Sequence, residues 1–285
     1  MNAIKFLRHV IPNQFKDSVV TITTCLTPVK RTTSYTNIYH CCVYKTGSQW
    51  IRRIFSDPRV YRWCGLKPIN GAMLNNVSGK IVQLSERRKP EGFSSNRFVA
   101  GLFMSYDNFM EMKQYGNYVA FFIKRDPREL VVSWYFSTRY THVKRAGVNS
   151  LRAQMKGMTD EEGIIFSIDY WSRNQLFDIL LQWQKAEENN ESIKVFSFEK
   201  LTGNDGFYYL GKIFSYCKIE IPQKKLLSVY EAHSAKNIAS KKSDDKYAFA
   251  SKNNNLKWPK YFTKDVEKYF LKAAPTLVED LGYKW

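Results

Sequence analysis

Two short stretches of the chain carry residues suited to holding a highly charged anion. The first, at 43–50, reads VYKTGSQW. Gly47 lets the backbone approach a ligand closely, and the N–H groups opening a helix predicted over 48–55 point at the same place. Lys45 adds a full positive charge, and the hydroxyl and amide side chains around it add donors. We predict an anion cradle here; the simpler interpretation is a plain strand-to-helix turn.

The second stretch, at 124–135, reads KRDPRELVVSWY. Asp126 is a natural helix N-cap and Pro127 pre-sets the first helical turn. Arg125 lies at the end of an apolar run, where it can meet an anion, and Ser133 falls two turns into the predicted helix. The simpler interpretation is a well-capped helix with a surface arginine.

The elements that must position these residues alternate between strand and helix. Strands are predicted at 37–44, 97–104, 118–123 and 193–198. Helices are predicted at 48–55, 128–139, 168–188, 207–216, 223–233 and 264–281, and 237–257 is expected to be a long loop. This alternation favours a single-domain α/β fold with a central parallel sheet flanked by helices on both faces. Both anion-binding stretches then follow the carboxyl ends of strands, where such sheets bind ligands.

A nucleotide kinase is one alternative for this pattern. The Walker A motif requires G-x-x-x-x-G-K-[ST], but Lys45 precedes the only glycine of its stretch. Magnesium-dependent turnover of ATP would mark that alternative.

In this order, and 80 residues apart from Lys45 to Arg125, the two stretches resemble the paired motifs of PAPS-dependent sulfotransferases. PAPS is 3′-phosphoadenosine 5′-phosphosulfate. The first resembles the 5′-phosphosulfate loop Y-P-K-S-G-T-T-W, in a K-T-G-S-Q-W form closer to bacterial members. The second resembles the 3′-phosphate motif R-[ND]-P-x-[DE]-x-x-x-S-x-Y. Residues 196–201 are similar to the family's Y-E-D-L strand end, and Trp258 with 262–263 to the end of its R-K-G segment.

The resemblance implies a P-loop-like sulfotransferase domain at 36–285, preceded by an N-terminal extension at 1–35. It implies single-step, in-line transfer of the sulfuryl group from PAPS to a hydroxyl or amine of a small-molecule acceptor. No metal is expected, because protein cations neutralise the developing charge.

The PAPS-binding residues implied by the resemblance are Lys45, Thr46, Gly47, Ser48, Gln49, Trp50, Arg125, Ser133, Tyr170, Ser234 and Lys252. Lys45 is the implied catalytic lysine, which stabilises charge on the leaving phosphate. Arg125 and Ser133 are implied to grip the 3′-phosphate. Lys252 matches the lysine of the R-K-G loop, although Ser251 and Asn253 replace its neighbours.

The acceptor base is where the chain departs from the family pattern. Many members carry a histidine in a K-T-H-L strand, and the corresponding run at 99–103 has none. We expect His142 to be the catalytic base, with Glu86 and Asp107 as rivals; the simpler interpretation of His142 is a surface loop histidine. His40 lies in a buried-strand pattern and is expected to be structural. An amine or an acidic phenol as acceptor needs no strong base.

Composition limits the partners. The chain has 285 residues, a net charge of +18 and 44% hydrophobic residues. Such a basic excess suits nucleic acid, an anionic membrane surface or a highly anionic ligand. A basic protein that binds polyanions or nucleic acid is the other alternative, although no nucleic-acid reader motif is present. We expect a small-molecule acceptor, no specific nucleic acid and no membrane, with the oligomeric state open.

The cysteines and the apolar runs bear on cellular location. The five cysteines and four histidines show no metal-ligand spacing. No export signal and no run long enough to span a bilayer is visible. We therefore expect a cytoplasmic protein without a metal.

Overall fold

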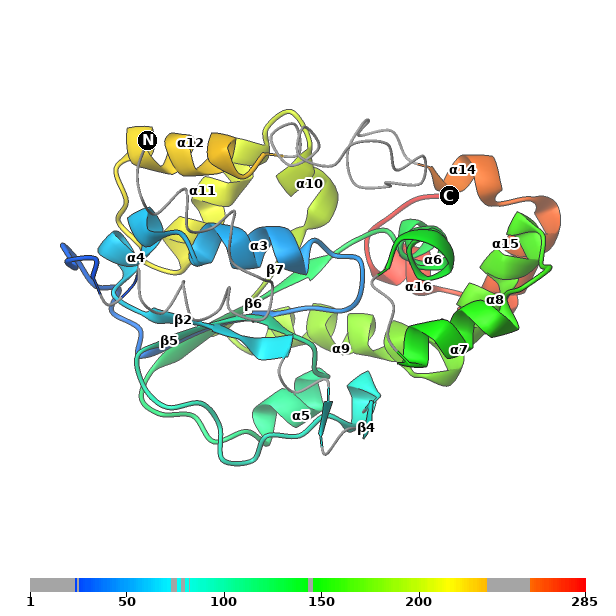
Figure 1. Cartoon of the computed structure of the whole chain (residues 1–285), viewed down its shortest axis with the longest axis horizontal. Helices are drawn as coiled ribbons and strands as arrows, with labels where there is room; N and C mark the ends of the chain where they lie inside the picture. The colour runs from blue at the N-terminus through cyan, green and yellow to red at the C-terminus, as the bar shows by residue number, and fades with distance from the viewer. Residues whose placement is uncertain are drawn as a thin grey trace.

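The structure, a computed structural model, describes residues 24, 26–72, 83–142, 146–234 and 257–285, together with the backbone of 76–77 and 80–81. Its centre is a five-stranded sheet in the order β2-β5-β1-β6-β7 (Figure 1). All neighbouring pairs in this sheet are parallel. Its strands are β1 (Asn37–Cys41), β2 (Lys67–Asn70), β5 (Arg97–Leu102), β6 (Tyr118–Lys124) and β7 (Ile193–Ser197). The predicted α/β fold is confirmed.

Register brings the ends of β1 and β6 together. Asn37 pairs with Tyr118 and Cys41 with Phe122, without a shift. Every residue of β1 is buried, as are the five central residues of β6, because helices cover both faces of the sheet. The loops that leave these two strands therefore start side by side at the carboxyl edge.

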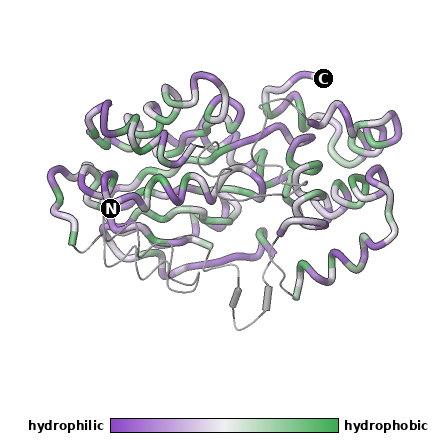
Figure 2. Tube along the Cα trace, turned by 45° about the horizontal axis from the view of Figure 1, so that its top comes forward, coloured by the Kyte–Doolittle hydropathy of each residue, from purple (hydrophilic) through white to green (hydrophobic). Residues whose placement is uncertain are grey.

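Helices pack on both faces of the sheet and enclose two hydrophobic cores (Figure 1). One core includes residues of α3 (Ser48–Phe55), α4 (Pro58–Cys64), α10 (Phe198–Thr202), α11 (Gly206–Tyr216) and α12 (Gln223–Ala232). The other includes residues of α5 (Tyr106–Met110), α6 (Pro127–Phe136), α8 (Asp160–Arg173), α9 (Leu176–Asn189), α15 (Lys264–Ala273) and α16 (Leu277–Asp280). Polar and apolar residues interchange along the outer helices, as in amphipathic helices (Figure 2).

The described part of the chain also contains shorter elements. These are β3 (Asn76–Val77), β4 (Lys80–Ile81), a 3₁₀ turn at Leu84–Glu86, a π-helical turn at Ser137–Thr141, α7 (Ala146–Gln154) and α14 (Trp258–Tyr261). In this part of the chain, no helix combines the length and apolar character needed to cross a bilayer.

Two predicted helices were wrong in extent. The segment predicted as one helix at 168–188 is the end of α8 and most of α9, separated at Gln175, whose φ of 56° is left-handed. The helix predicted at 264–281 ends at Ala273, because Pro275 cannot donate the next helical hydrogen bond. The short edge strand β2 contains a proline and shows no apolar alternation, so the sequence pattern did not reveal it. The predicted loop at 237–257 lies outside the described residues except for its last residue.

Candidate functional site

The two predicted anion-binding stretches meet at the carboxyl ends of β1 and β6. Nη1 of Arg125 donates a hydrogen bond of 2.9 Å to the carbonyl oxygen of Lys45. Lys45 and Gly47 both have left-handed backbone conformations, with φ of 69° and 78°. The loop therefore turns sharply before α3, whose opening N–H groups have no partner within the helix.

Gly47 is required by both conformation and space. A Cβ on it would lie 2.9 Å from Cε2 of Phe198, the first residue after β7. The same Phe198 ring lies 4.4 Å from the Arg125 guanidinium carbon. Residues from three strand ends thus form one compact cradle, in which the Phe198 ring packs directly against Gly47.

The side-chain donors predicted for the cradle are engaged within the protein. The Thr46 hydroxyl is buried and donates to the carbonyl of Val43 at 2.9 Å. Ser48 shares a hydrogen bond with the buried thiol of Cys42. The exposed Gln49 accepts from Nη2 of Arg52 at 2.8 Å. An anion in the cradle would therefore be met mainly by backbone N–H groups and by the Lys45 ammonium.

Positive charge is concentrated in this cradle. Burial, reinforced by the nearby Arg125, lowers the pKa of Lys45 to about 8. Burial also lowers the pKa of Arg125, an effect that Glu129 opposes through an ion pair of 3.1 Å. Lys45 and Arg125 are thus partly buried cations beside each other, and Glu129 offsets part of their charge; such perturbed groups concentrate at functional sites.

A third cation was missed by the sequence reasoning. Glu129 accepts hydrogen bonds from the backbone N–H groups of Lys257 and Trp258, which fixes the start of α14 against α6. Burial lowers the pKa of Lys257, Glu129 raises it and Arg125 lowers it again, so its amine lies within the electric field of both charged neighbours. The only sequence signal was a lysine directly before the Trp258 landmark.

Ser133 lies on the same side of α6 as the Arg125–Glu129 pair. Glu129 and Ser133 are four residues apart and therefore share a helix face. Ser133 is buried. The predicted 3′-phosphate pair, Arg125 and Ser133, is thus aligned along one face of α6, with Glu129 between them.

Trp50 and Ser234 lie where α3 meets the end of α12. Nε1 of Trp50 donates to the carbonyl of His233 at 3.0 Å, and its ring meets Tyr230 edge-on at 6.3 Å. His233 in turn contacts Asp57 Oδ2 at 3.0 Å. Ser234 follows directly, so the structure places it near Trp50. Lys252 lies outside the described residues.

Tyr170 lies in an aromatic cluster beside Lys45. Its ring stacks on Trp134 at 4.5 Å. Burial raises the pKa of Tyr170 to about 12, and the charges of Tyr44 and Arg87 act on it as well. Tyr44 directly precedes Lys45, so Tyr170 lies near the Lys45 side of the cradle.

Arg87 is the second residue that sequence reasoning missed. It is only 2% exposed, and its Nη2 donates to the Tyr44 hydroxyl at 3.1 Å. Its Nη1 donates to the carbonyl of Phe103 at 3.3 Å, and the Phe103 ring lies 5.6 Å from that of Tyr44. A polar segment with two adjacent arginines gave no sign that the first one is buried in an aromatic environment.

The candidate bases do not gather at Lys45. His142 is exposed and follows the π-helical turn, where its carbonyl accepts from Nη2 of Arg152 at 2.7 Å. At 1.5 Å per helical residue, His142 lies roughly 20 Å along the helix from Pro127. This separation argues against direct proton transfer by His142 at the cradle.

The rival candidates Glu86 and Asp107 are both exposed. Glu86 directly precedes Arg87, and Asp107 on α5 accepts from Nε2 of Gln182 at 3.0 Å. His40 is fully buried, its Nδ1 accepts the Gly101 N–H at 3.2 Å, and burial lowers its pKa to about 3. His40 is therefore a neutral core histidine. Among the described residues, no three His, Cys, Asp or Glu side chains are grouped as metal ligands.

Comparison with known proteins gave matches only in structure. No model of a protein family and no curated protein matches the sequence. Mouse sulfotransferase SULT7A1, solved in complex with PAP, matches with a TM-score of 0.52 and 12% identity over 94% of this chain and 92% of that one. Retinol dehydratase in complex with androsterone and the inactive cofactor PAP matches with a TM-score of 0.50 and 11% identity, over 87% and 82%.

These matches cover most of each chain, and they were found without sequence similarity strong enough to establish a family. What they establish is the architecture: the chain has the P-loop-like α/β fold of sulfotransferases.

Proposed function

We propose that the protein is a PAPS-dependent sulfotransferase acting on a hydroxyl or amine of a small-molecule acceptor. The observation that carries the proposal is the meeting of Lys45 and Arg125 at adjacent strand ends, with a hydrogen bond of 2.9 Å between them. Sulfotransferase activity requires one site for a ligand phosphorylated at both ends. A cradle of backbone N–H groups with an arginine beside it meets that requirement.

The donor set fits PAPS. Gly47 has no side chain that would keep a ligand away from the loop backbone, and the cations of Lys45, Arg125 and Lys257 match several phosphate charges. When bound, PAPS supplies the sulfuryl group that in-line transfer delivers to the acceptor oxygen or nitrogen. Lys45 would neutralise the charge developing on the departing phosphate.

The remaining residues take binding roles in this proposal. The backbone of 46–49 would hold the 5′-phosphosulfate, and Arg125 with Ser133 the 3′-phosphate. Trp50 and Ser234 would line the adenine, since both lie at the contact of α3 with the end of α12. Lys252 keeps the role that the resemblance implied, as a further contact to the 3′-phosphate.

The aromatic cluster beside Lys45 would receive the acceptor. Tyr44, Phe103, Trp134 and Tyr170 offer apolar faces, and Tyr170 stays protonated at neutral pH. The positive charges of Arg87 and Lys45 would lower the pKa of the acceptor hydroxyl, so that its proton can pass to solvent water as the sulfuryl group is transferred, without a separate strong base. We therefore favour Arg87 over His142 as the residue that activates the acceptor.

Parallel thermal-shift measurements test the proposal. PAP should stabilise the protein without magnesium, whereas ATP–magnesium and duplex DNA should not. Stabilisation by ATP–magnesium alone would favour the kinase alternative, and by DNA alone the polyanion-binding alternative.

Turnover is tested by transfer of radiolabelled sulfate from PAPS across a panel of phenols, alcohols, amines and sugars. Lys45→Ala should abolish transfer while the folded protein still binds PAP weakly. Near-full activity of this variant would overturn the assignment of Lys45.

A further inference from the structure

A basic and partly apolar surface lies at the end of α3 that is remote from the cradle (Figure 1). It is formed by residues 26–31, α4 and residues 220–228, and we call it the basic end. Residues 26–31 lie against α4: the N–H groups of Lys30 and Arg31 donate to the Arg62 carbonyl at 2.8 and 3.3 Å. Nη1 of Arg59 joins α4 to α12 through Ser228 Oγ at 2.6 Å. The three segments therefore form one continuous surface.

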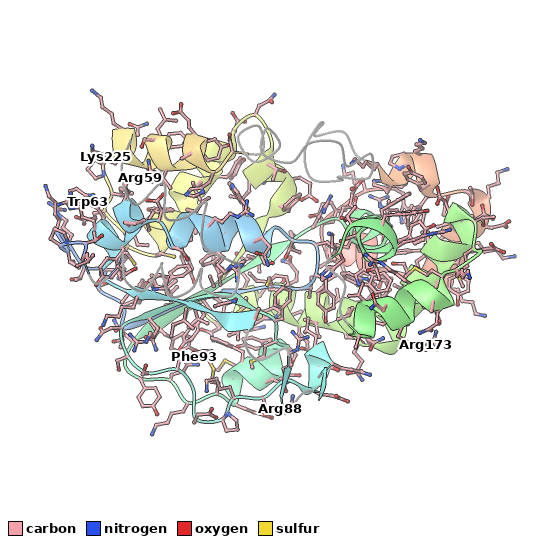
Figure 3. All side chains as sticks on the ribbon, viewed as in Figure 1. Arg59, Trp63, Arg88, Phe93, Arg173 and Lys225 are labelled. Atoms are coloured by element: carbon pink, nitrogen blue, oxygen red, sulfur yellow. The ribbon has the colours of Figure 1, made fainter. Side chains whose placement is uncertain are left out.

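Positive charge predominates on the basic end. Its charged members are the cations Lys30, Arg31, Arg59, Arg62, Lys224 and Lys225 and the carboxylate Glu220, and the buried carboxylate of Asp57 lies directly before α4. The carboxylates pair with cations of the same surface, Asp57 with Arg59 at 2.7 Å and Glu220 with Arg31. The surplus is thus positive, and Lys225, Arg59 and Trp63 lie at the same end of the molecule (Figure 3).

Large apolar side chains are exposed within this charged surface. Leu26 is 76% exposed, Val29 42% and Leu227 39%. Trp63 lies beside them, with the Lys30 ammonium 5.7 Å from its ring. Aliphatic and tryptophan side chains among lysines and arginines are typical of surfaces that lie on a bilayer, where the apolar groups enter the headgroup region and the cations meet lipid phosphates.

A shallow hollow of about 490 Å³ adjoins the basic end. It is lined by Arg31, Thr32, Ser34, Ser215, Lys218 and Glu220, among others. Hydroxyl groups with two cations suit the phosphate of a lipid headgroup, although Glu220 limits the charge there.

We propose that the basic end binds the surface of a bilayer containing anionic phospholipid. Charge complementarity selects an anionic partner, and the exposed aliphatic side chains favour lipid over nucleic acid, which offers no apolar phase for them. The sequence led us to expect no membrane contact; the tertiary structure brings together cations and apolar residues that are about 200 positions apart in the chain. This binding is independent of sulfuryl transfer, because the basic end contains no residue assigned to the site.

Co-sedimentation with vesicles tests this proposal. The full-length protein should sediment with phosphatidylcholine vesicles containing phosphatidylserine, and much less with phosphatidylcholine alone. Each lysine at an anionic surface contributes about fivefold to partitioning, so Lys224→Glu with Lys225→Glu should weaken binding at least roughly 30-fold. Leu26→Ser with Val29→Ser should also weaken it, because the apolar contribution is lost.

The matched control is Lys268→Glu with Lys272→Glu, the same change of charge on exposed positions of α15 at the other end of the molecule (Figure 1). It should retain most vesicle binding, and all variants should keep the thermal shift with PAP, which shows that they are folded. Equal losses in the control and the basic-end variant would overturn the proposal, since binding would then follow net charge alone. The proposal would also be overturned if the wild-type protein did not sediment with the vesicles, or if it bound RNA in place of vesicles.

Discussion

The protonation state of Lys45 should control the affinity of the protein for PAP. Burial and Arg125 lower the pKa of the free Lys45 from 10.5 to about 8. A bound phosphate beside the ammonium favours its charged form and raises this pKa again. Binding above about pH 8 must therefore be accompanied by proton uptake, and the affinity falls as the pH rises through this window.

The size of the change in PAP affinity follows from the shift in the pKa of Lys45. If the pKa in the complex returns to at least its ordinary value, the affinity falls about tenfold per pH unit above about pH 8, or roughly 30-fold between pH 7 and 9.5. The free energy of unfolding changes with pH in the opposite direction. Between about pH 8 and 10.5 the unfolded chain holds the proton that the folded chain has lost, so Lys45 makes the ligand-free fold more stable as the pH rises, by up to about 3 kcal/mol.

Titration calorimetry with PAP in buffers of different ionisation enthalpy measures both the affinity and the proton uptake. Lys45→Arg is the informative variant, because arginine stays charged throughout this range and should give a nearly flat affinity profile. A flat profile for the wild type would refute the reasoning. A drop of equal steepness in Lys45→Arg would assign the titration to another group, such as Lys257, whose pKa is also lowered.

Three further substitutions test other parts of the site. Gly47→Ala should lower the free energy of unfolding, measured in urea, by about 2 kcal/mol. The control Gly157→Ala has a similar φ of 84° but open space around its Cβ, so it should cost only about 1 kcal/mol. Equal costs would show that the contact at residue 47 is unimportant. Arg87→Gln should lower kcat/KM for alcohol acceptors about 10- to 100-fold without changing the affinity for PAP. A parallel loss of PAP affinity would mean that Arg87 contributes to cofactor binding instead. Asp57→Asn should cost about 2 kcal/mol, because Arg59 and His233 hold the pKa of this carboxyl far below its usual range. Since a depressed carboxyl pKa contributes stability that is lost on acidification, the difference from the wild type should shrink below about pH 4; a constant difference would show that charge is not its cause.

The sequence by itself determined the local elements and the edge at which the site lies. Apolar runs predicted four of the five sheet strands to within a few residues at each end, and the Asp126–Pro127 cap predicted the start of α6. These signals are local: alternation, capping and proline geometry act within a few residues. In parallel sheets the strand ends share one edge, so the approach of Lys45 to Arg125 was predictable without coordinates.

Only the tertiary structure decided which side chains are buried beside one another. The stacking of Tyr170 on Trp134, the burial of Arg87 against Tyr44 and the entry of Lys257 into the charge cluster all depend on contacts between distant segments. It also added the π-helical turn Ser137–Thr141 to the predicted helix, so that His142 lies at the far end of a continuous helical segment. Burial and charge proximity are properties of packing, and since they set the pKa of Lys45, the chemistry of the cradle could be worked out only from the folded chain.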